Sequence, residues 1–277
     1  MPPLDLQRGV AVVTGAASGI GRATALALAR RGCALALVDR NADGLGETAR
    51  SAEAHGVRVT EHVMDVSDAA AITALPEAVV EAHGRVTVLV NCAGVALAGR
   101  FEELSMEEFR WLFEINFFAV VGFTKAFLPH LQRAEAAHIA NVSSLFGIIA
   151  PAEQTAYVAS KFAVRGFSES LRHELEGTSV GVTVVHPGGV KTGISRGARV
   201  AAGADEAAES RKAARFEKHF LTTPPEEVGE AIAEAVERRR PRLLVAAGAR
   251  QGAILQRLFP VRYWRFMQRD FEKLNRT

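Results

Sequence analysis

The sequence has little of what marks a secreted, metal-binding or nucleic-acid-binding protein. It has 2 cysteines among 277 residues, too few for a disulfide framework, and Cys33 and Cys92 lack the spacing of metal ligands. Both lie in apolar runs, so we expect buried free thiols, no metal site and a reducing cytoplasmic location. The formal net charge of +2 gives no general reason to expect nucleic-acid binding.

Long hydrophobic runs and a leader pattern are also missing. Residues 1–9 lack the charged-then-apolar order of a signal peptide. No uninterrupted apolar stretch reaches the ~18 residues typical of a membrane-spanning helix, so none is expected. No internal repeat is evident.

Short apolar runs instead alternate with longer segments of helical pattern. The predicted strands cover 10–13, 34–38, 58–64, 86–90, 138–142, 180–185 and 243–247. The predicted helices cover 22–31, 69–83, 106–131, 157–175 and 224–239, with the second broken or restarted at Pro76. This alternation predicts an α/β fold of the Rossmann type. We expect one domain over residues 1–277, with a doubly wound, seven-stranded parallel sheet and helices on both faces.

A glycine-rich turn joins the first predicted strand to the first helix. It runs from Thr14 to Gly21 with glycines at 15, 19 and 21. Strand, glycine-rich turn and helix form the context of a dinucleotide-binding turn, in which the backbone approaches a pyrophosphate at a helix N-terminus. The residues expected to bind there are Gly15, Ser18, Gly19, Ile20 and Gly21.

Acidic residues end the next two predicted strands. Asp39 ends the second and is placed to accept hydrogen bonds from ribose hydroxyls, which favours NAD. Arg40 is able to hold a 2′-phosphate, which leaves NADP open, although a solvated arginine is the simpler interpretation. Asp65, followed by Val66, either binds an adenine amino group or caps the helix that follows.

Tyr157 and Lys161 lie four residues apart, and therefore on one face of a predicted helix. A neighbouring ammonium favours the phenolate and lowers the pKa of the tyrosine, which makes the pair a candidate general acid/base. Asn116 lies in apolar surroundings and needs hydrogen-bond partners. A structural role and a role in a proton relay are both open for it.

Taken together, these elements resemble the short-chain dehydrogenase/reductase family over residues 9–247. The resemblance is carried by their order, their spacing and the following residues: Thr14-Gly15-x-x-x-Gly19-x-Gly21, Asp65, Asn91-Cys92-Ala93-Gly94, Asn116, Ser144, Tyr157-x-x-x-Lys161, Pro187-Gly188 and Thr192. Cys92 stands where the family often has Asn, a departure that we expect to leave the chemistry unchanged.

The resemblance implies reversible, NAD(P)-dependent interconversion of an alcohol and a carbonyl compound. It implies that Tyr157 moves the substrate proton, that Lys161 lowers its pKa and binds ribose, and that Ser144 holds the substrate oxygen. Asn116 would hold a relay water. The remaining cofactor contacts would come from Asn91, Ala93, Gly94, Pro187, Gly188, Val190 and Thr192, the last at the nicotinamide carboxamide. The family's habit suggests a homodimer or homotetramer, and a catalytically silent dinucleotide-binding regulator or scaffold is the alternative.

The substrate is expected to be hydrophobic. Apolar residues predicted to line its pocket are Val95, Leu97, Leu145, Phe146 and Ile148, together with parts of 189–223. Residues 193–223 lack a strand pattern and are interpreted as a mobile helical lid, called the lid segment below. Its cations, Arg196, Arg199, Arg211 and Lys212, are able to grip an acidic group, but a solvated face is favoured.

The last residues, 249–277, form an amphipathic and basic extension. Arg250 to Thr277 holds seven Arg or Lys against Asp270 and Glu272. Apolar residues recur there at helical spacing, namely Trp264, Met267, Phe271 and Leu274. This pattern suits a helix that docks on protein, which we favour, or one that contacts a membrane surface peripherally.

Overall fold

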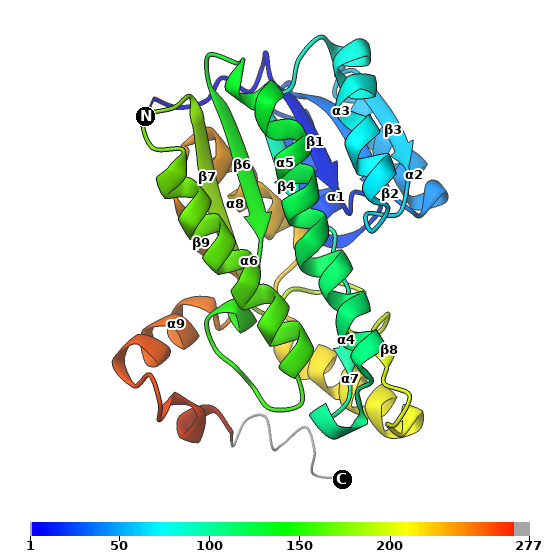
Figure 1. Ribbon diagram of the computed structural model, residues 1–277, viewed down its shortest axis with the longest axis vertical. Helices are drawn as coiled ribbons and strands as arrows, with labels where there is room; N and C mark the ends of the chain where they lie inside the picture. The colour runs from blue at the N-terminus through cyan, green and yellow to red at the C-terminus, as the bar shows by residue number, and fades with distance from the viewer. Residues whose placement is uncertain (1, 269–277) are drawn as a thin grey trace.

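The structure is a computed structural model that describes residues 2–268. Its centre is a sheet of seven parallel strands in the order β3-β2-β1-β4-β6-β7-β9 (Figure 1). The strands are β1 Val10–Thr14, β2 Ala34–Asp39, β3 Val59–Val63, β4 Val88–Asn91, β6 Ala137–Val142, β7 Val180–Pro187 and β9 Arg242–Val245. The predicted fold class is confirmed, and every predicted strand lies in this sheet.

Helices cover both faces of the sheet. One face packs against α1 (Gly19–Ala29), α2 (Ala42–Glu53) and α8 (Pro225–Glu237). The other packs against α3 (Ala69–His83), α5 (Ala119–Gln132) and α6 (Thr155–Glu174), which stand in front of the strands in Figure 1. Because both faces are buried, β1, β2 and β4 are apolar up to their last residue, without polar alternation. All eight residues of β7 are buried.

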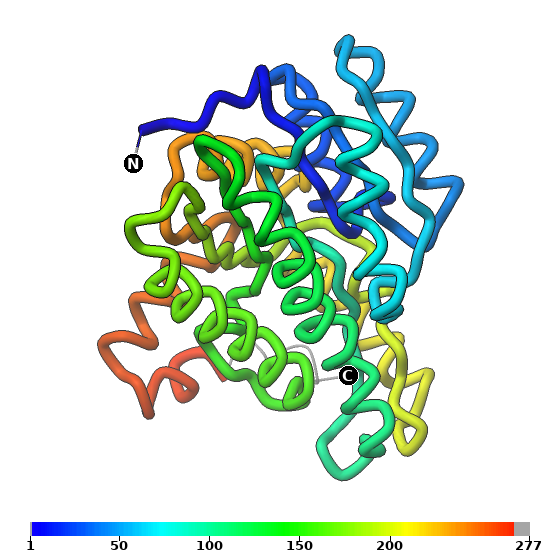
Figure 2. The backbone as a smooth tube through the Cα atoms, turned by 45° about the horizontal axis from the view of Figure 1, so that its top comes forward, coloured from blue at the N-terminus to red at the C-terminus, as the bar shows by residue number. Residues whose placement is uncertain are grey.

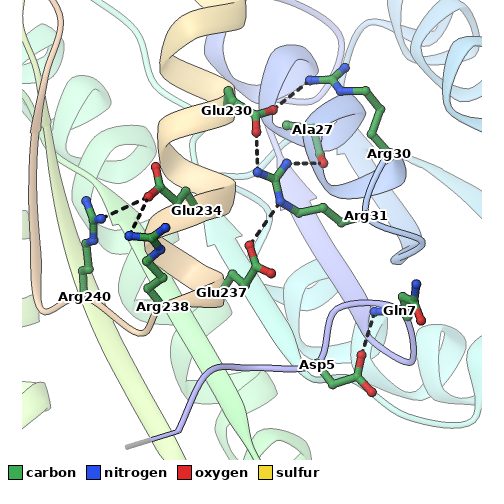
Figure 3. Close-up of polar contacts among 10 residues, drawn as sticks. All are labelled: Asp5, Gln7, Ala27, Arg30, Arg31, Glu230, Glu234, Glu237, Arg238 and Arg240. Carbon is green, nitrogen blue, oxygen red and sulfur yellow. Dashed lines mark hydrogen bonds and ion pairs between the residues drawn. The ribbon is translucent and has the colours of Figure 1, made fainter.

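The contact between α1 and α8 shows how small residues set this packing. A Cβ on Gly229 of α8 would lie 2.4 Å from the carbonyl carbon of Ala23, so only glycine permits this approach. At the rim, Arg30 and Arg31, directly after α1, pair with Glu230 of α8 (Figure 3). Such exposed pairs contribute about 0–1 kcal/mol each, so the buried contact dominates.

Two predicted helices differ from expectation. Pro76 does not break α3, which continues from Ala69 to His83 with the proline buried. The predicted helix 106–131 consists of α4 (Met106–Phe113), a π-helical turn at Glu114–Phe118, and α5.

The same continuous helix is the one candidate membrane span among residues 2–268. Met106–Gln132 qualifies by length and composition, with a mean hydropathy of 1.4. Its inner face packs in the core, where Phe123 and Phe127 are buried. Length and composition are therefore weak evidence for a membrane span here.

The lid segment contains a strand, contrary to prediction. β8 (Arg199–Val200) pairs in parallel with β5 (Leu97–Ala98), and α7 (Glu206–Phe220) follows. Figure 2 shows this yellow stretch beside the teal segment that leads into α4. Two-residue strands carry no hydrophobic periodicity, so sequence patterns do not reveal them. After β9, α9 (Ala249–Leu258) begins the C-terminal extension.

Candidate active site

A cavity of about 560 Å³ opens at the carboxyl ends of the strands. It lies at the β1–β4 junction, where the strand order reverses and α/β sheets bind ligands. Among the predicted site residues, those lining it are Gly15, Ser18, Gly19, Ile20, Gly21, Asp39, Arg40, Asp65, Val66, Ala93, Gly94, Ser144, Tyr157, Lys161, Pro187, Gly188, Val190 and Thr192. Asn91 and Asn116 are not among the lining residues.

The glycine-rich turn forms a cradle that side chains would fill. Gly15 has a φ of 70°, and a Cβ there would lie 2.9 Å from the backbone of Ala93. Gly19 has a φ of 53° and faces the methyl group of Thr192. Both conformations favour glycine. The backbone between β1 and α1 is therefore open to a phosphate-bearing ligand at the N-terminus of α1, and these residues fit a dinucleotide.

The acidic residues at the ends of β2 and β3 hold the turns around the cavity. Asp39 accepts hydrogen bonds from the backbone N–H groups of Ala17 and Asn41, each at 3.0 Å. Asp65 accepts from the N–H and hydroxyl of Ser67, and these bonds lower the pKa of its carboxyl. The cap of α3 is Asp68, so the capping alternative for Asp65 is wrong.

Asn91 lies behind the cavity, at the centre of a buried polar network. Its amide donates to Asn141 on β6 at 2.8 Å and to Thr124 on α5 at 3.2 Å. Asn141 in turn donates to Ser168 on α6. The network fixes β4 and β6 against the helices, so the side chain of Asn91 positions the site from behind.

Tyr157 projects from the first turn of α6 toward Ser144, which follows β6. The two residues line the cavity together, and Ser144 Oγ accepts a hydrogen bond from the N–H of Phe146 at 3.0 Å. Burial raises the pKa of Tyr157 to about 12 in this chain. The expectation that Lys161 holds this pKa below its usual value is therefore wrong for the chain alone.

Lys161 is the buried, charged neighbour of Tyr157. Its ammonium lies 5.7 Å from the centre of the Tyr157 ring and donates to the carbonyl of Val142 at 3.1 Å. Burial lowers the pKa of Lys161 to about 8. Below that pH the lysine carries its charge, and this charge favours the phenolate of Tyr157.

Asn116 lies in the π-helical turn and is fully buried. Its amide bridges the backbone of Val95, accepting from the N–H at 2.8 Å and donating to the carbonyl at 3.0 Å. It also donates to Ser160 at 3.2 Å. These bonds satisfy both of its donors, as the structural alternative requires, and link α6 to the strand-end loop that lines the cavity.

His186 is a site residue that sequence reasoning missed. It is fully buried at the end of β7, and its Nδ1 donates to the carbonyl of Ser144 at 2.9 Å. Burial lowers the pKa of His186 to about 4, so the ring is neutral with the proton on Nδ1. The sequence signal that could have revealed His186 is its position directly before Pro187, at the carboxyl end of a strand that ends beside the cavity.

One part of the cavity wall is apolar. It includes Val95, Leu145, Phe146, Ile149, Phe216, Phe220 and Met267. Predictions for Leu97 and Ile148 are wrong, because each is 2% exposed and packs in the core beside the cavity. Phe216 and Phe220 come from α7, so the lid segment supplies part of this wall.

Three of the four lid cations pair with acidic side chains of the protein. Arg196 pairs with Glu217, and Lys212 pairs with Glu153 and Glu209. None of the four predicted lid cations is among the residues that line the cavity. A role for Arg196 or Lys212 in gripping an acidic substrate therefore has no support.

Arg199 of the lid segment anchors it to α4. Its guanidinium lies 5.2 Å from the ring centre of Trp111 and 3.8 Å from the carboxylate of Glu108. Glu108 accepts from the N–H of Ala202 at 3.0 Å and from the N–H and hydroxyl of Ser105. These hydrogen bonds lower the pKa of Glu108.

The two cysteines are free thiols, as predicted. Burial raises the pKa of each to about 12, so neither is a thiolate at neutral pH. Cys92 also lines the cavity. No cluster of three or more metal-ligating side chains occurs among residues 2–268.

Comparison with known proteins decides the family. The family model for short chain dehydrogenases matches residues 9–202. The chain belongs to the short-chain dehydrogenase/reductase family. SadH of Mycobacterium tuberculosis, an oxidoreductase by name, is 41% identical over 260 residues, which make up 93% of each chain. A dehydrogenase/reductase SDR family member 7B from Xenopus tropicalis is 32% identical over 95% of this chain and 85% of its own.

Solved structures of short-chain dehydrogenases agree with this assignment. A short chain dehydrogenase/reductase from Burkholderia phymatum in complex with NAD has a TM-score of 0.84 and 32% identity, over 93% of this chain and 95% of its own. An alcohol dehydrogenase from Thermococcus sibiricus complexed with 5-hydroxy-NADP has a TM-score of 0.72 and 33% identity, over 85% of this chain and 93% of its own. This short-chain dehydrogenase/reductase is therefore an oxidoreductase, and its fold is that of the family.

Proposed function

We propose that the protein interconverts a hydrophobic alcohol and its ketone or aldehyde, with Tyr157 as the general acid/base. The observation that carries the proposal is that Ser144, Tyr157 and Lys161 meet at one cavity whose other end is the glycine cradle. A protein that only binds a dinucleotide has no need of a serine, a tyrosine and a buried lysine gathered at one cavity.

The cofactor end of the cavity suits a nicotinamide dinucleotide. Gly15 and Gly19 leave room for a pyrophosphate, and Asp39 faces the cavity with a carboxylate that accepts ribose hydroxyls and repels a 2′-phosphate. Arg40 is exposed at the same end. The Burkholderia phymatum relative holds NAD and the Thermococcus sibiricus relative holds 5-hydroxy-NADP. We favour NAD because Asp39 is fixed by two backbone donors, whereas Arg40 projects into solvent.

When bound, the nicotinamide supplies hydride transfer, and the side chains manage the proton. For alcohol oxidation, Tyr157 must be a phenolate when it takes the hydroxyl proton, which needs a pKa well below its value of about 12 in the chain alone. The nearby Lys161 charge acts in that direction. Ser144 donates its hydroxyl hydrogen to the substrate oxygen and stabilises the developing charge. In reduction, Tyr157 returns the proton.

The substrate is proposed to be lipophilic because the wall beyond Tyr157 is apolar. Leu145, Phe146 and Ile149 line it from one side, and Phe216 and Phe220 from the lid segment. An apolar wall favours apolar groups and leaves the hydroxyls of a polyol without partners.

Turnover of an alcohol panel with NAD and NADP, followed by absorbance of the reduced nicotinamide, tests both proposals. Lipophilic secondary alcohols, including steroid, long-chain and aromatic ones, should outperform small polyols, and NAD should outperform NADP. Faster turnover of polyols would refute the substrate class. Dinucleotide binding without turnover of any member would favour the regulator alternative.

A further inference from the structure

The C-terminal extension has one side that packs on the protein. We call residues 249–268 the tail segment. A Cβ on Gly252 would lie 2.9 Å from Leu145, so α9 sits directly on a residue of the cavity wall. The hydroxyl of Tyr263 accepts a hydrogen bond from the N–H of Ala150 at 2.9 Å, and Met267 lines the cavity. The inner side of the tail segment is therefore docked on its own chain, next to the site.

The outer side of the tail segment leaves large apolar side chains in solvent. Their exposed fractions are 60% for Ile254, 66% for Leu258, 43% for Phe259, 87% for Val261 and 57% for Phe266. The ring centres of Phe259 and Phe266 are 5.3 Å apart, so the turn after α9 brings these two exposed rings together. Figure 1 shows the tail segment, in orange to red, at the lower left edge of the molecule, outside the sheet. This is a grouped apolar surface, beyond the scattered exposure that is normal.

The charged side chains of the tail segment are all positive. Arg250, Arg257, Arg262 and Arg265 are exposed, and residues 249–268 contain no Asp or Glu. On α9, Arg250, Ile254, Arg257 and Leu258 follow helical spacing and so share one face. Cations and large apolar side chains are therefore interleaved on the same outer surface.

This combination distinguishes between the possible occupants. A second copy related by two-fold symmetry would bring this surface against itself, so its four arginines would meet no Asp or Glu of residues 249–268, and interface cores are depleted in charge. An anionic bilayer matches both parts of the surface, because its headgroups attract arginine and its acyl boundary accepts leucine, valine and phenylalanine.

We propose that the outer face of the tail segment binds the surface of an anionic lipid bilayer. The arginines contact headgroups, and Leu258, Val261 and Phe266 enter the acyl boundary. Because the inner face of the same segment packs against the cavity wall at Leu145 and supplies Met267, the bound bilayer lies next to the apolar end of the cavity. If the proposed function holds, lipophilic substrate reaches Tyr157 from the membrane.

Flotation of the full-length protein with lipid vesicles tests the proposal. The protein should float with vesicles of phosphatidylcholine and phosphatidylglycerol, and should stay unbound with phosphatidylcholine alone. Added salt should weaken the binding. Arg257→Gln with Arg262→Gln should lower the partition coefficient about twenty-five-fold, or about fivefold for each arginine. Leu258→Ser with Val261→Ser should also weaken it.

A matched control pair removes the same charge elsewhere. Arg58 precedes β3 and Arg133 follows α5, so both lie near the opposite, amino edge of the sheet. Arg58→Gln with Arg133→Gln should float like the wild type. Equal loss in both pairs would show that only net charge matters and would overturn the proposal.

Two other outcomes also test the bilayer proposal. Failure of the wild type to float would overturn the proposal, and conversion of a dimer to monomers by Leu258→Ser with Val261→Ser would then assign the surface to a second copy. Flotation does not depend on turnover, so Tyr157→Phe should float normally. A protein that floats but turns over no alcohol would refute the proposed function and leave the bilayer surface intact.

Discussion

Replacement of Lys161 by methionine tests how a buried phenol becomes a useful base. The lysine ammonium lies 5.7 Å from the ring centre of Tyr157. At an effective dielectric constant of about 20, one unit charge at this distance favours the phenolate by about 3 kcal/mol, or about two pH units. Because the positive charge lowers the pKa of Tyr157, its removal must raise that pKa. Lys161→Met should therefore move the ascending, acid-side limb of alcohol oxidation upward by about two pH units.

The assay is the pH dependence of kcat/KM for alcohol oxidation at saturating cofactor. At neutral pH, where Lys161 of the wild type is charged because its pKa is about 8, the variant should be slower by about a hundredfold. Lys125→Met is the matched control, since it removes an exposed lysine on α5. Dinucleotide affinity, measured separately, isolates any loss of ribose binding. A slower variant with an unshifted pH profile would refute the electrostatic role.

Three further changes test other parts of the account. Glu108→Gln should destabilise the protein by about 1–3 kcal/mol near neutral pH. Since hydrogen bonds lower the pKa of Glu108 below its usual 4.5, the wild-type advantage should be present above that value and disappear as the pH falls through the folded-state pKa, as measured by urea unfolding. Gly166→Ala on α6 should stabilise by about 0.5–1 kcal/mol, whereas Gly252→Ala should lose that gain because its Cβ meets Leu145, and thermal unfolding of the two compares them. Asp39→Ser should raise the kcat/KM ratio of NADP to NAD about tenfold, because a carboxylate that repels the 2′-phosphate is gone. An unchanged ratio would show that Asp39 does not select the cofactor.

Most of the sheet and much of the site were predictable because local signals agree with the global fold. Buried parallel strands are continuous apolar runs, and the carboxyl ends of such strands meet at one edge. The glycine-rich turn, Asp39, Ser144 and Tyr157 therefore came together as predicted. Each of these predictions needed only the order of the elements along the chain and the periodicity of their apolar residues.

The misses share a different cause, since they depend on contacts distant in sequence. Asn91 looks like a strand-end residue beside the cavity, but its partners on β6 and α5 turn it inward. Leu97 pairs with Arg199 through strands of two residues, which no periodicity reveals. The pKa of Tyr157 is set by burial, which a helix-spaced Tyr–Lys pair does not show.

Tyr157→Phe tests the central claim most directly. Loss of the phenol removes the general acid/base, a contribution of about 10²–10⁴ in rate, while the cradle at Gly15 and Gly19 stays intact. Tyr263→Phe is the matched control, because Tyr263 is the only other tyrosine of the chain. The decisive measurement is kcat for a turned-over lipophilic alcohol together with dinucleotide affinity. We predict that Tyr157→Phe loses turnover and keeps dinucleotide binding, with Tyr263→Phe active. Turnover that survives in Tyr157→Phe would contradict the mechanism.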